Sequence, residues 1–247
     1  MCGVQETTRR VRAVPFGGWW VDGVLVAAFV ALTAALANGH VLGVDVAVAT
    51  WVDAHRPPVA ALIGRGLNFL GSGGTLTVIC ALLAIVLVVR RRSVRPIVPV
   101  VAAFLATGFA ILPLKLWTDR AAPRSTVPDK VQIFNHLPAV EYAESYPSGH
   151  LVNTLVWYGV LALLLAPWLA PRARRWLRIA PPVIVFGSTV YLNYHWLTDS
   201  IAGLLLGVVL DRLLARVPWD DVPLPPLPRG VHRPGVFVDG AGAGTAD

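Results

Sequence analysis

Charged residues are scarce in this chain. They make up 14% of its 247 residues, while hydrophobic residues make up 55%. A soluble globular domain has about 25% charged residues. This imbalance excludes an ordinary soluble domain and indicates an integral membrane protein.

Lysine and cysteine are also rare. Of the 21 basic residues only Lys115 and Lys130 are lysines. Cys2 lies in the polar amino-terminal segment and Cys80 inside an apolar run, so we expect no disulfide. The chain offers no carboxylate-rich cluster for a metal, and we expect no metal or other cofactor. No internal repeat is apparent, which disfavours a transporter built from two related halves.

The net charge of +7 could indicate a nucleic-acid-binding protein. The basic residues, however, occur in short clusters between apolar runs rather than along one soluble face. Orientation in a bilayer explains this arrangement better, and we expect no nucleic-acid partner.

Six apolar runs approach the roughly 20 residues needed to cross a bilayer. They are Trp20 to Leu36, Gly73 to Val89, Ile97 to Leu114, His150 to Leu169, Ile179 to Tyr194 and Ser200 to Leu214. The first follows an arginine-containing tail, as in a signal peptide, but lacks a convincing cleavage site and is interpreted as a retained anchor. The sequence therefore predicts an all-α fold, a polytopic six-helix transmembrane bundle. Its oligomeric state cannot be predicted.

The basic residues are distributed unevenly between the two sides of this bundle. Fifteen of the 21 fall on one side, in the amino-terminal tail, around residues 90–95 and 172–178, and after residue 211. By the positive-inside rule both termini are cytoplasmic, and the loop from Lys115 to Pro147 and the turn at His195 face outward. We predict a cytoplasmic tail over 1–15, a membrane domain over 16–216 and a proline-rich and glycine-rich disordered cytoplasmic tail over 217–247.

The segment from Val41 to Leu70 lies between the first two runs. Its apolar residues recur at near-helical spacing ahead of Pro57 and Pro58, and Trp51 suits a membrane interface. We predict an amphipathic piece on the membrane surface.

The stretch Pro147-Ser148-Gly149-His150 stands where a long polar loop turns into the fourth run. Ser can cap a helix, Gly lets a ligand approach the backbone, and the free N–H groups of a first helical turn bind anions. His150 could then donate or accept a proton beside the anion. An ordinary capped helix is the alternative interpretation of this stretch.

Two further groups of polar residues are predicted to reach the same side. Lys115 ends the third run, and Arg120 and Arg124 follow it in a loop of unusual length, which is typical of a functional segment. His195 and Asp199 are four residues apart at the start of the last run, so the carboxylate can orient the imidazole. Solvated loop charges and simple helix caps are the alternatives.

Together these residues resemble the three signature motifs of the phosphatidic acid phosphatase type 2 superfamily: K-x6-R-P, P-S-G-H and S-R-x5-H-x3-D. The matching positions are Lys115 with Pro123, then Pro147 to His150, then Ser188 with His195 and Asp199. The resemblance covers about Asp45 to Leu214. It implies an extracytoplasmic active site that removes a phosphate or diphosphate from a membrane lipid, such as a polyprenyl diphosphate or a phosphatidate-like lipid, without a metal.

The resemblance also implies the role of each residue. His195 would attack phosphorus to form a phosphohistidine, Asp199 would orient His195, and His150 would protonate the leaving oxygen and then activate water. Lys115, Ser148 and the Gly149 N–H would bind phosphoryl oxygens.

Two positions depart from the family's pattern. The arginines of the first and third motifs are Ala122 and Thr189 here, and neither residue replaces a bidentate arginine on phosphate. We predict that Arg120 or Arg124 binds the substrate in their place. The alternative function is a catalytically weakened member that binds or translocates phospholipid head groups. An unrelated six-span transporter is a third interpretation.

Overall fold

The computed structural model describes residues 17–134, 144–224 and 237 of the chain. Within these residues it is all-helical and contains no β-strand. Its helices are α1 (Gly18–Ala37), α2 (Leu42–Ala54), α3 (Pro58–Asn68), α4 (Gly73–Arg91), α5 (Ile97–Thr118), α6 (Gly149–Leu164), α7 (Pro171–Tyr191) and α8 (Leu197–Ala215), with a short 3-10 helix at Phe69–Gly71. The predicted all-α fold is confirmed. The predicted tail over 1–15 lies outside the described residues.

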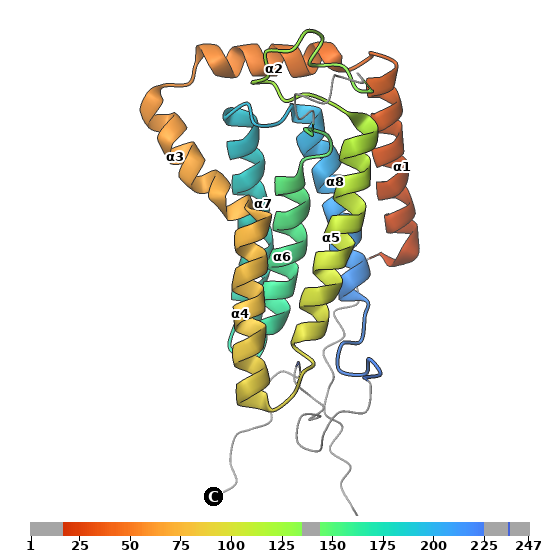
Figure 1. The fold of residues 1–247 in the computed structure, drawn as a ribbon, viewed down its shortest axis with the longest axis vertical. Helices are drawn as coiled ribbons and strands as arrows, with labels where there is room; N and C mark the ends of the chain where they lie inside the picture. The colour runs from red at the N-terminus through yellow and green to blue at the C-terminus, as the bar shows by residue number, and fades with distance from the viewer. Residues whose placement is uncertain (1–16, 135–143, 225–236, 238–247) are drawn as a thin grey trace, which may run out of the picture.

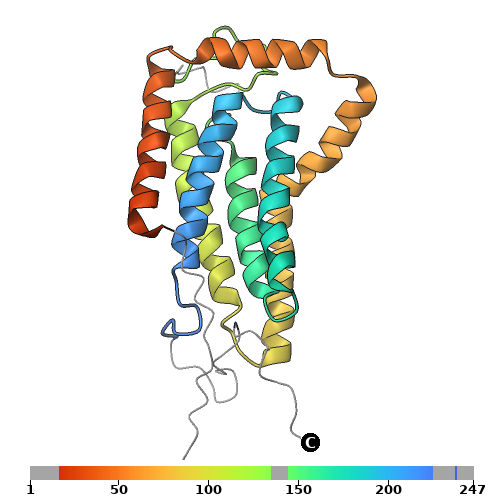
Figure 2. The same ribbon diagram turned by 180° about the vertical axis from the view of Figure 1, so that it is seen from behind.

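The helices form an elongated bundle with α6 in the middle. Figure 1 shows α1, α4, α5, α6, α7 and α8 running along the long axis, and Figure 2 shows the same arrangement from behind. Helix α6 contacts α4, α5, α7 and α8. It can be central because it is apolar all round, with Leu151, Val156, Trp157, Val160 and Leu164 all buried.

Helices α2 and α3 form the segment that was predicted to be amphipathic. Helix α2 lies across one end of the bundle, and α3 slants from there toward the start of α4 (Figure 1). The Asn193 side chain, in the turn before α8, donates a hydrogen bond to the Ala49 carbonyl of α2 at 3.1 Å. Helix α2 therefore covers the end of the bundle where α8 begins.

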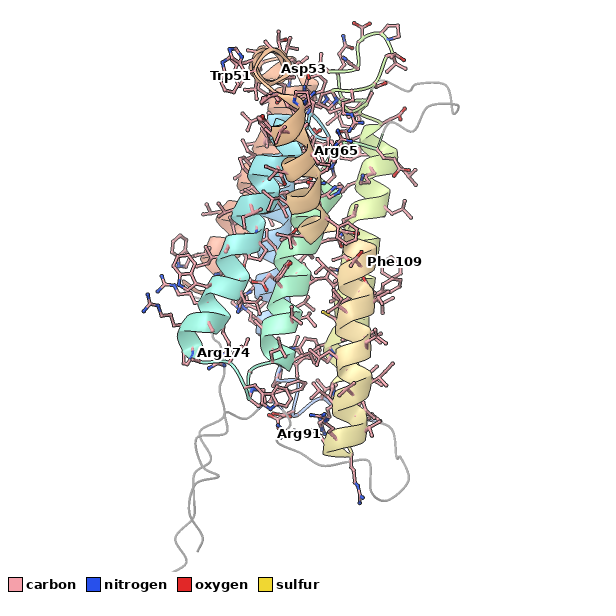
Figure 3. All side chains as sticks on the ribbon, turned by 90° about the vertical axis from the view of Figure 1, so that its left-hand side faces the viewer. Trp51, Asp53, Arg65, Arg91, Phe109 and Arg174 are labelled. Atoms are coloured by element: carbon pink, nitrogen blue, oxygen red, sulfur yellow. The ribbon has the colours of Figure 1, made fainter. Side chains whose placement is uncertain are left out.

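Three helices, α1, α4 and α5, are long and apolar enough to cross a membrane. Large apolar side chains point outward from them, such as Phe109 on α5 (Figure 3), as expected for contact with lipid. Helix α6 is apolar but has 16 residues, and α7 and α8 lie parallel to it. The chain is a multi-pass membrane protein. That it crosses the membrane six times stays a prediction.

Glycines bring α8 against α6. A Cβ atom on Gly203 would lie 2.6 Å from the Ser148 carbonyl oxygen, and one on Gly207 would lie 3.0 Å from the Val152 Cα atom. Real Cβ atoms essentially never lie as close as 2.6 Å to another atom and rarely as close as 3.0 Å, so glycine at both positions allows the two backbones to approach this closely. This approach places the first turn of α6 beside the first turn of α8.

Several predicted helix boundaries differ from the structure; the fourth run, for example, was predicted to end at Leu169, whereas α6 ends at Leu164. Helix α7 begins at Pro171, well before the predicted start at Ile179, because a proline is favourable at a first helical position. Beyond residue 216, Trp219 and Phe237 are buried in the larger hydrophobic cluster, and the predicted domain division at residue 216 stays a prediction. Burial of these two aromatic side chains stabilises packed structure at their positions, although the proline-rich composition predicts disorder there. The rest of the predicted tail lies outside the described residues.

Candidate active site

The three motifs meet at the end of the bundle that α2 covers. Lys115 lies in the last turn of α5, Gly149 begins α6, and Asp199 lies in the first turn of α8. The Ser148 N–H donates to the Asp199 carbonyl at 3.0 Å, and a Cβ on Gly149 would lie 3.6 Å from Lys115 Cε. Residues that are far apart in sequence therefore surround one small region.

The His195 ring has a defined tautomer. Its Nδ1 atom lies 2.9 Å from the Ser145 carbonyl oxygen, and because a carbonyl only accepts, Nδ1 must carry the hydrogen. The lone pair of the neutral ring is then on Nε2, which lies 3.4 Å from His150 Nδ1. His195 therefore directs an unprotonated nitrogen toward His150.

The environment of His195 also disfavours its protonation. The side chain is buried, and burial lowers its pKa well below the usual 6.5, with further lowering from the nearby charges of His150 and Lys115. The hydrogen bond to Ser145 acts in the opposite direction. His195 is therefore neutral at physiological pH, as a nitrogen nucleophile must be.

Asp199 reaches His195 through an intermediate residue. We predicted a direct contact, but Asp199 Oδ2 lies 3.9 Å from His195 Nδ1, beyond hydrogen-bond distance. The Ser145 hydroxyl lies between them, donating to Asp199 Oδ2 at 2.6 Å and lying 3.3 Å from Nδ1. Ser145 is thus a site residue that the sequence reasoning missed, because it precedes the second motif.

The Arg120 guanidinium is bound by two carboxylates, those of Asp199 and Asp45. Its side chain is fully buried, and Nη1 donates to Asp199 Oδ1 at 2.5 Å while Nη2 donates to Asp45 Oδ2 at 2.6 Å. Nε donates to the Val131 carbonyl at 3.0 Å. Because a buried guanidinium must be paired, every nitrogen is engaged by protein. This geometry favours a positioning role for Arg120 over the predicted contact with substrate.

Asp45 on α2 completes this buried network. Its carboxylate accepts the Thr198 N–H at 2.9 Å and the Thr198 hydroxyl at 2.5 Å, in addition to Arg120. The residue is 1% exposed. The sequence reasoning missed it because it was counted among the residues of a surface helix. The available signal was its position seven residues before Val52, which places both residues on the same face of α2, the face that is buried.

The start of α6 offers hydrogen-bond donors to an anion. The Ser148 hydroxyl is buried and has no hydrogen-bond partner in the described part of the chain. Lys115 Nζ donates to the Glu144 carbonyl, which holds the ammonium near Gly149. A free hydroxyl, a helix N-terminus and an ammonium form a positive cradle beside the two histidines.

The two positions that lack the family's arginines are not filled by Arg120. The Thr189 hydroxyl bonds the Val185 carbonyl of its own helix at 2.7 Å, so it does not point into the site. Arg124 is exposed, and its Cζ atom lies 4.6 Å from the centroid of the Tyr194 ring. Arg124 therefore lies beside the site, separated from the histidines by Tyr194.

No group of three or more His, Cys, Asp or Glu side chains is arranged to hold a metal ion within residues 17–134, 144–224 and 237. Independence from metal stays a prediction.

Comparisons with known proteins agree with the motifs. The model of the PAP2 superfamily matches residues 96–223. Phosphatidylglycerophosphatase B of Bacillus subtilis (strain 168) is 27% identical over 192 residues, covering 75% of this chain and 89% of the relative. The crystal structure of a transmembrane PAP2 type phosphatidylglycerolphosphate phosphatase from Bacillus subtilis superposes with a TM-score of 0.65 at 25% identity, covering 78% of this chain and 93% of the other. The chain belongs to the PAP2 superfamily.

Proposed function

We propose that this membrane protein is a lipid phosphatase that hydrolyses a phosphomonoester or diphosphate through a phosphohistidine on His195. The observation that carries the proposal is the His195 ring, whose Nδ1 hydrogen is held by the Ser145 carbonyl so that Nε2 faces His150. A binding protein has no need of a nucleophile whose tautomer is fixed in this way.

The first half of the reaction transfers the phosphoryl group to the protein. His195 Nε2 attacks phosphorus, the bond between phosphorus and the lipid oxygen breaks, and protonated His150 gives its proton to that oxygen. In-line attack places phosphorus between the two rings, so the 3.4 Å contact between them lengthens when substrate binds. Lys115, Ser148 and the Gly149 N–H stabilise the charge on the phosphoryl oxygens.

The second half releases phosphate. His150, now neutral, takes a proton from water, and the resulting hydroxide attacks phosphorus. The bond between phosphorus and His195 Nε2 breaks, and both histidines return to their starting states. Asp199 keeps His195 oriented through Ser145, and Arg120 and Asp45 keep Asp199 in place.

The substrate presents its head group at the end of the bundle, where an amphiphile lying in the bilayer can reach the histidines. Phosphatidylglycerophosphate is the first candidate, because the Bacillus subtilis relative is a phosphatidylglycerophosphatase. Phosphatidate and polyprenyl diphosphates are the others. We place this end on the extracytoplasmic side, as the positive-inside rule predicts.

The test is phosphate release from a panel of these lipids by the purified protein, without metal and with a chelator. We expect release that is abolished in His195→Ala and His150→Ala and is unaffected by the chelator. Ala122 and Thr189 favour the alternative of a weakened member that binds head groups. Lipid binding without release above the two variants would support that alternative.

A further inference from the structure

A second basic site lies next to the histidines. A cavity of about 220 Å³ is lined by Arg56, Ala61, Arg65, Arg124, Leu192 and Tyr194, and we call it the arginine pocket. Its three arginines come from separate segments: the turn between α2 and α3, helix α3, and the loop after α5. Arg56 and Arg65 match none of the family's motifs, so nothing in the resemblance anticipates a site here.

The positive charge of this pocket is incompletely balanced. Arg56 pairs with Asp53 at 2.7 Å and donates to the Tyr191 carbonyl at 2.9 Å, which fixes it in place. Arg65 and Arg124 have no acidic partner among the residues that the structure describes. Like charges facing one cavity repel each other, and an anion between them removes that repulsion. Guanidinium groups in such an arrangement suit phosphate, which accepts paired hydrogen bonds.

Tyr194 connects the pocket with the catalytic histidines. One side of its ring carries Arg124, with 4.6 Å between the guanidinium carbon and the ring centroid. The His150 ring lies 6.5 Å away, centroid to centroid. One ligand can therefore extend from the histidines past Tyr194 into the arginine pocket. Figure 3 shows Arg65 on α3 at the end of the bundle that carries Trp51 and Asp53, which is the end where the histidines lie.

We propose that the arginine pocket binds a second phosphate of the substrate, a phosphodiester joined to the scissile phosphomonoester by a short carbon linker. A diphosphate fits less well, because its phosphorus atoms share one bridging oxygen, whereas the Tyr194 ring stands between Arg124 and His150. The proposal rests on the lipid phosphatase function and adds to it a determinant of substrate choice. It also explains how the substrate can be bound without arginines at 122 and 189, since the arginine pocket binds the second phosphate and supplies part of the binding energy.

The test compares two lipids with the same acyl chains. Phosphatidylglycerophosphate carries both groups, and phosphatidate carries only the phosphomonoester. We expect the kcat/KM for phosphatidylglycerophosphate, divided by that for phosphatidate, to fall about tenfold or more in Arg65→Gln and in Arg124→Gln. Each variant loses a charged hydrogen bond to the second phosphate. The assay is run at 0.15 M salt, where exposed charges act over no more than about 8 Å.

The matched control is Arg91→Gln. Arg91 also stacks on an aromatic ring, that of Trp168 at 5.5 Å, but it lies at the opposite end of the bundle (Figure 3). The substrate ratio is expected to stay unchanged in this variant. An unchanged ratio in Arg65→Gln, or equal losses on both lipids, would overturn the proposal without touching the phosphatase function.

A binding measurement separates the two proposals. If the unmodified protein releases no phosphate from either lipid, the phosphatase function fails, and affinity for the two lipids is measured on the His195→Ala variant. The arginine pocket then requires tighter binding of phosphatidylglycerophosphate than of phosphatidate, and loss of this preference when Arg65→Gln is added. Equal affinities would overturn it.

Discussion

At the scale of single residues, the candidate site contains a buried network of charges that ends at the Ser145 hydroxyl beside His195. Asp45, Arg120 and Asp199 are each fully or almost fully buried, and Ser145 links the last of them to His195. Burying three charges is costly unless each is paired with good geometry. Here every carboxylate oxygen accepts at least one hydrogen bond, so the network can hold Asp199 rigidly beneath the Ser145 hydroxyl.

Asp45→Ala tests this network. Arg120 would lose one of its two carboxylates, and Thr198 would lose the acceptor of its N–H. Removing one partner of a buried pair costs about 3–5 kcal/mol, so we expect a loss of unfolding free energy of that size in detergent, together with lower kcat. Asp53→Ala, on the same helix but in a partly exposed pair, is the control for stability alone and should cost about 1 kcal/mol or less of unfolding free energy. Similar losses in both variants would contradict a special role for Asp45.

The ionisation of His195 gives a second prediction. Its pKa is lowered by burial and by the charges of His150 and Lys115, so the neutral nucleophile persists until the pH falls through this lowered value. The acidic limb of kcat/KM against pH should therefore lie below 6.5. In Lys115→Met one cause of the lowering is gone, so the limb should move up toward 6.5 whatever the remaining activity. A limb that lies above 6.5, or moves down in the variant, would contradict this explanation.

Sequence reasoning predicted the residues that have motif positions and missed those defined by contact alone. Lys115, Ser148, Gly149, His150, His195 and Asp199 lie together as the motif order implied. Asp45 and Ser145 were missed, because their roles depend on which atoms α2 and the loop before Tyr146 bring to Asp199. Arg120 was expected at the substrate for the same reason: sequence gives its charge but not the two carboxylates that bind it.

At the scale of secondary structure, the site depends on how closely α6 and α8 approach. The Ser148 N–H reaches the Asp199 carbonyl because Gly203 leaves room for the Ser148 backbone. Apolar runs predicted these helices, but nothing in their periodicity shows which glycine faces which helix. The distances around each glycine supply that information.

Gly203→Ala should therefore damage the site. The added methyl group would lie 2.6 Å from the Ser148 carbonyl oxygen, and overpacking of this kind costs about 1–3 kcal/mol. We expect a lower thermal midpoint in detergent. We also expect a lower kcat at temperatures where the variant is still fully folded, because the strain falls on the turn that holds Ser148 and Gly149.

Gly187→Ala on α7 is the matched control. Apart from its chain neighbours and the backbone of its own helix, no atom lies within 4 Å of the Cβ position there. The variant should therefore be as active as the unmodified protein and no less stable, since alanine is the better helix former. If Gly203→Ala behaved in the same way, the close approach of α6 and α8 would not be needed for catalysis.

At the scale of the whole molecule, the two ends of the bundle differ in charge and in chemistry. Arg91 and Arg174 lie at one end, and Trp51, Asp53 and Arg65 at the other (Figure 3). The first end carries the arginine clusters that the positive-inside rule assigns to the cytoplasm, and the second carries the histidines. The orientation of the protein therefore decides from which side of the membrane the substrate is taken.

Cysteine labelling in intact cells tests this orientation. In a Cys2→Ser background, Cys80 is buried and should not react, so a membrane-impermeant maleimide reports only on introduced thiols. Asp53→Cys, whose side chain is 62% exposed, should be labelled in intact cells. Arg172→Cys, in the first turn of α7 beside Arg174, should be labelled only after the membrane is opened. The reverse pattern would place the histidines on the cytoplasmic side, and the substrate would then have to come from the inner leaflet.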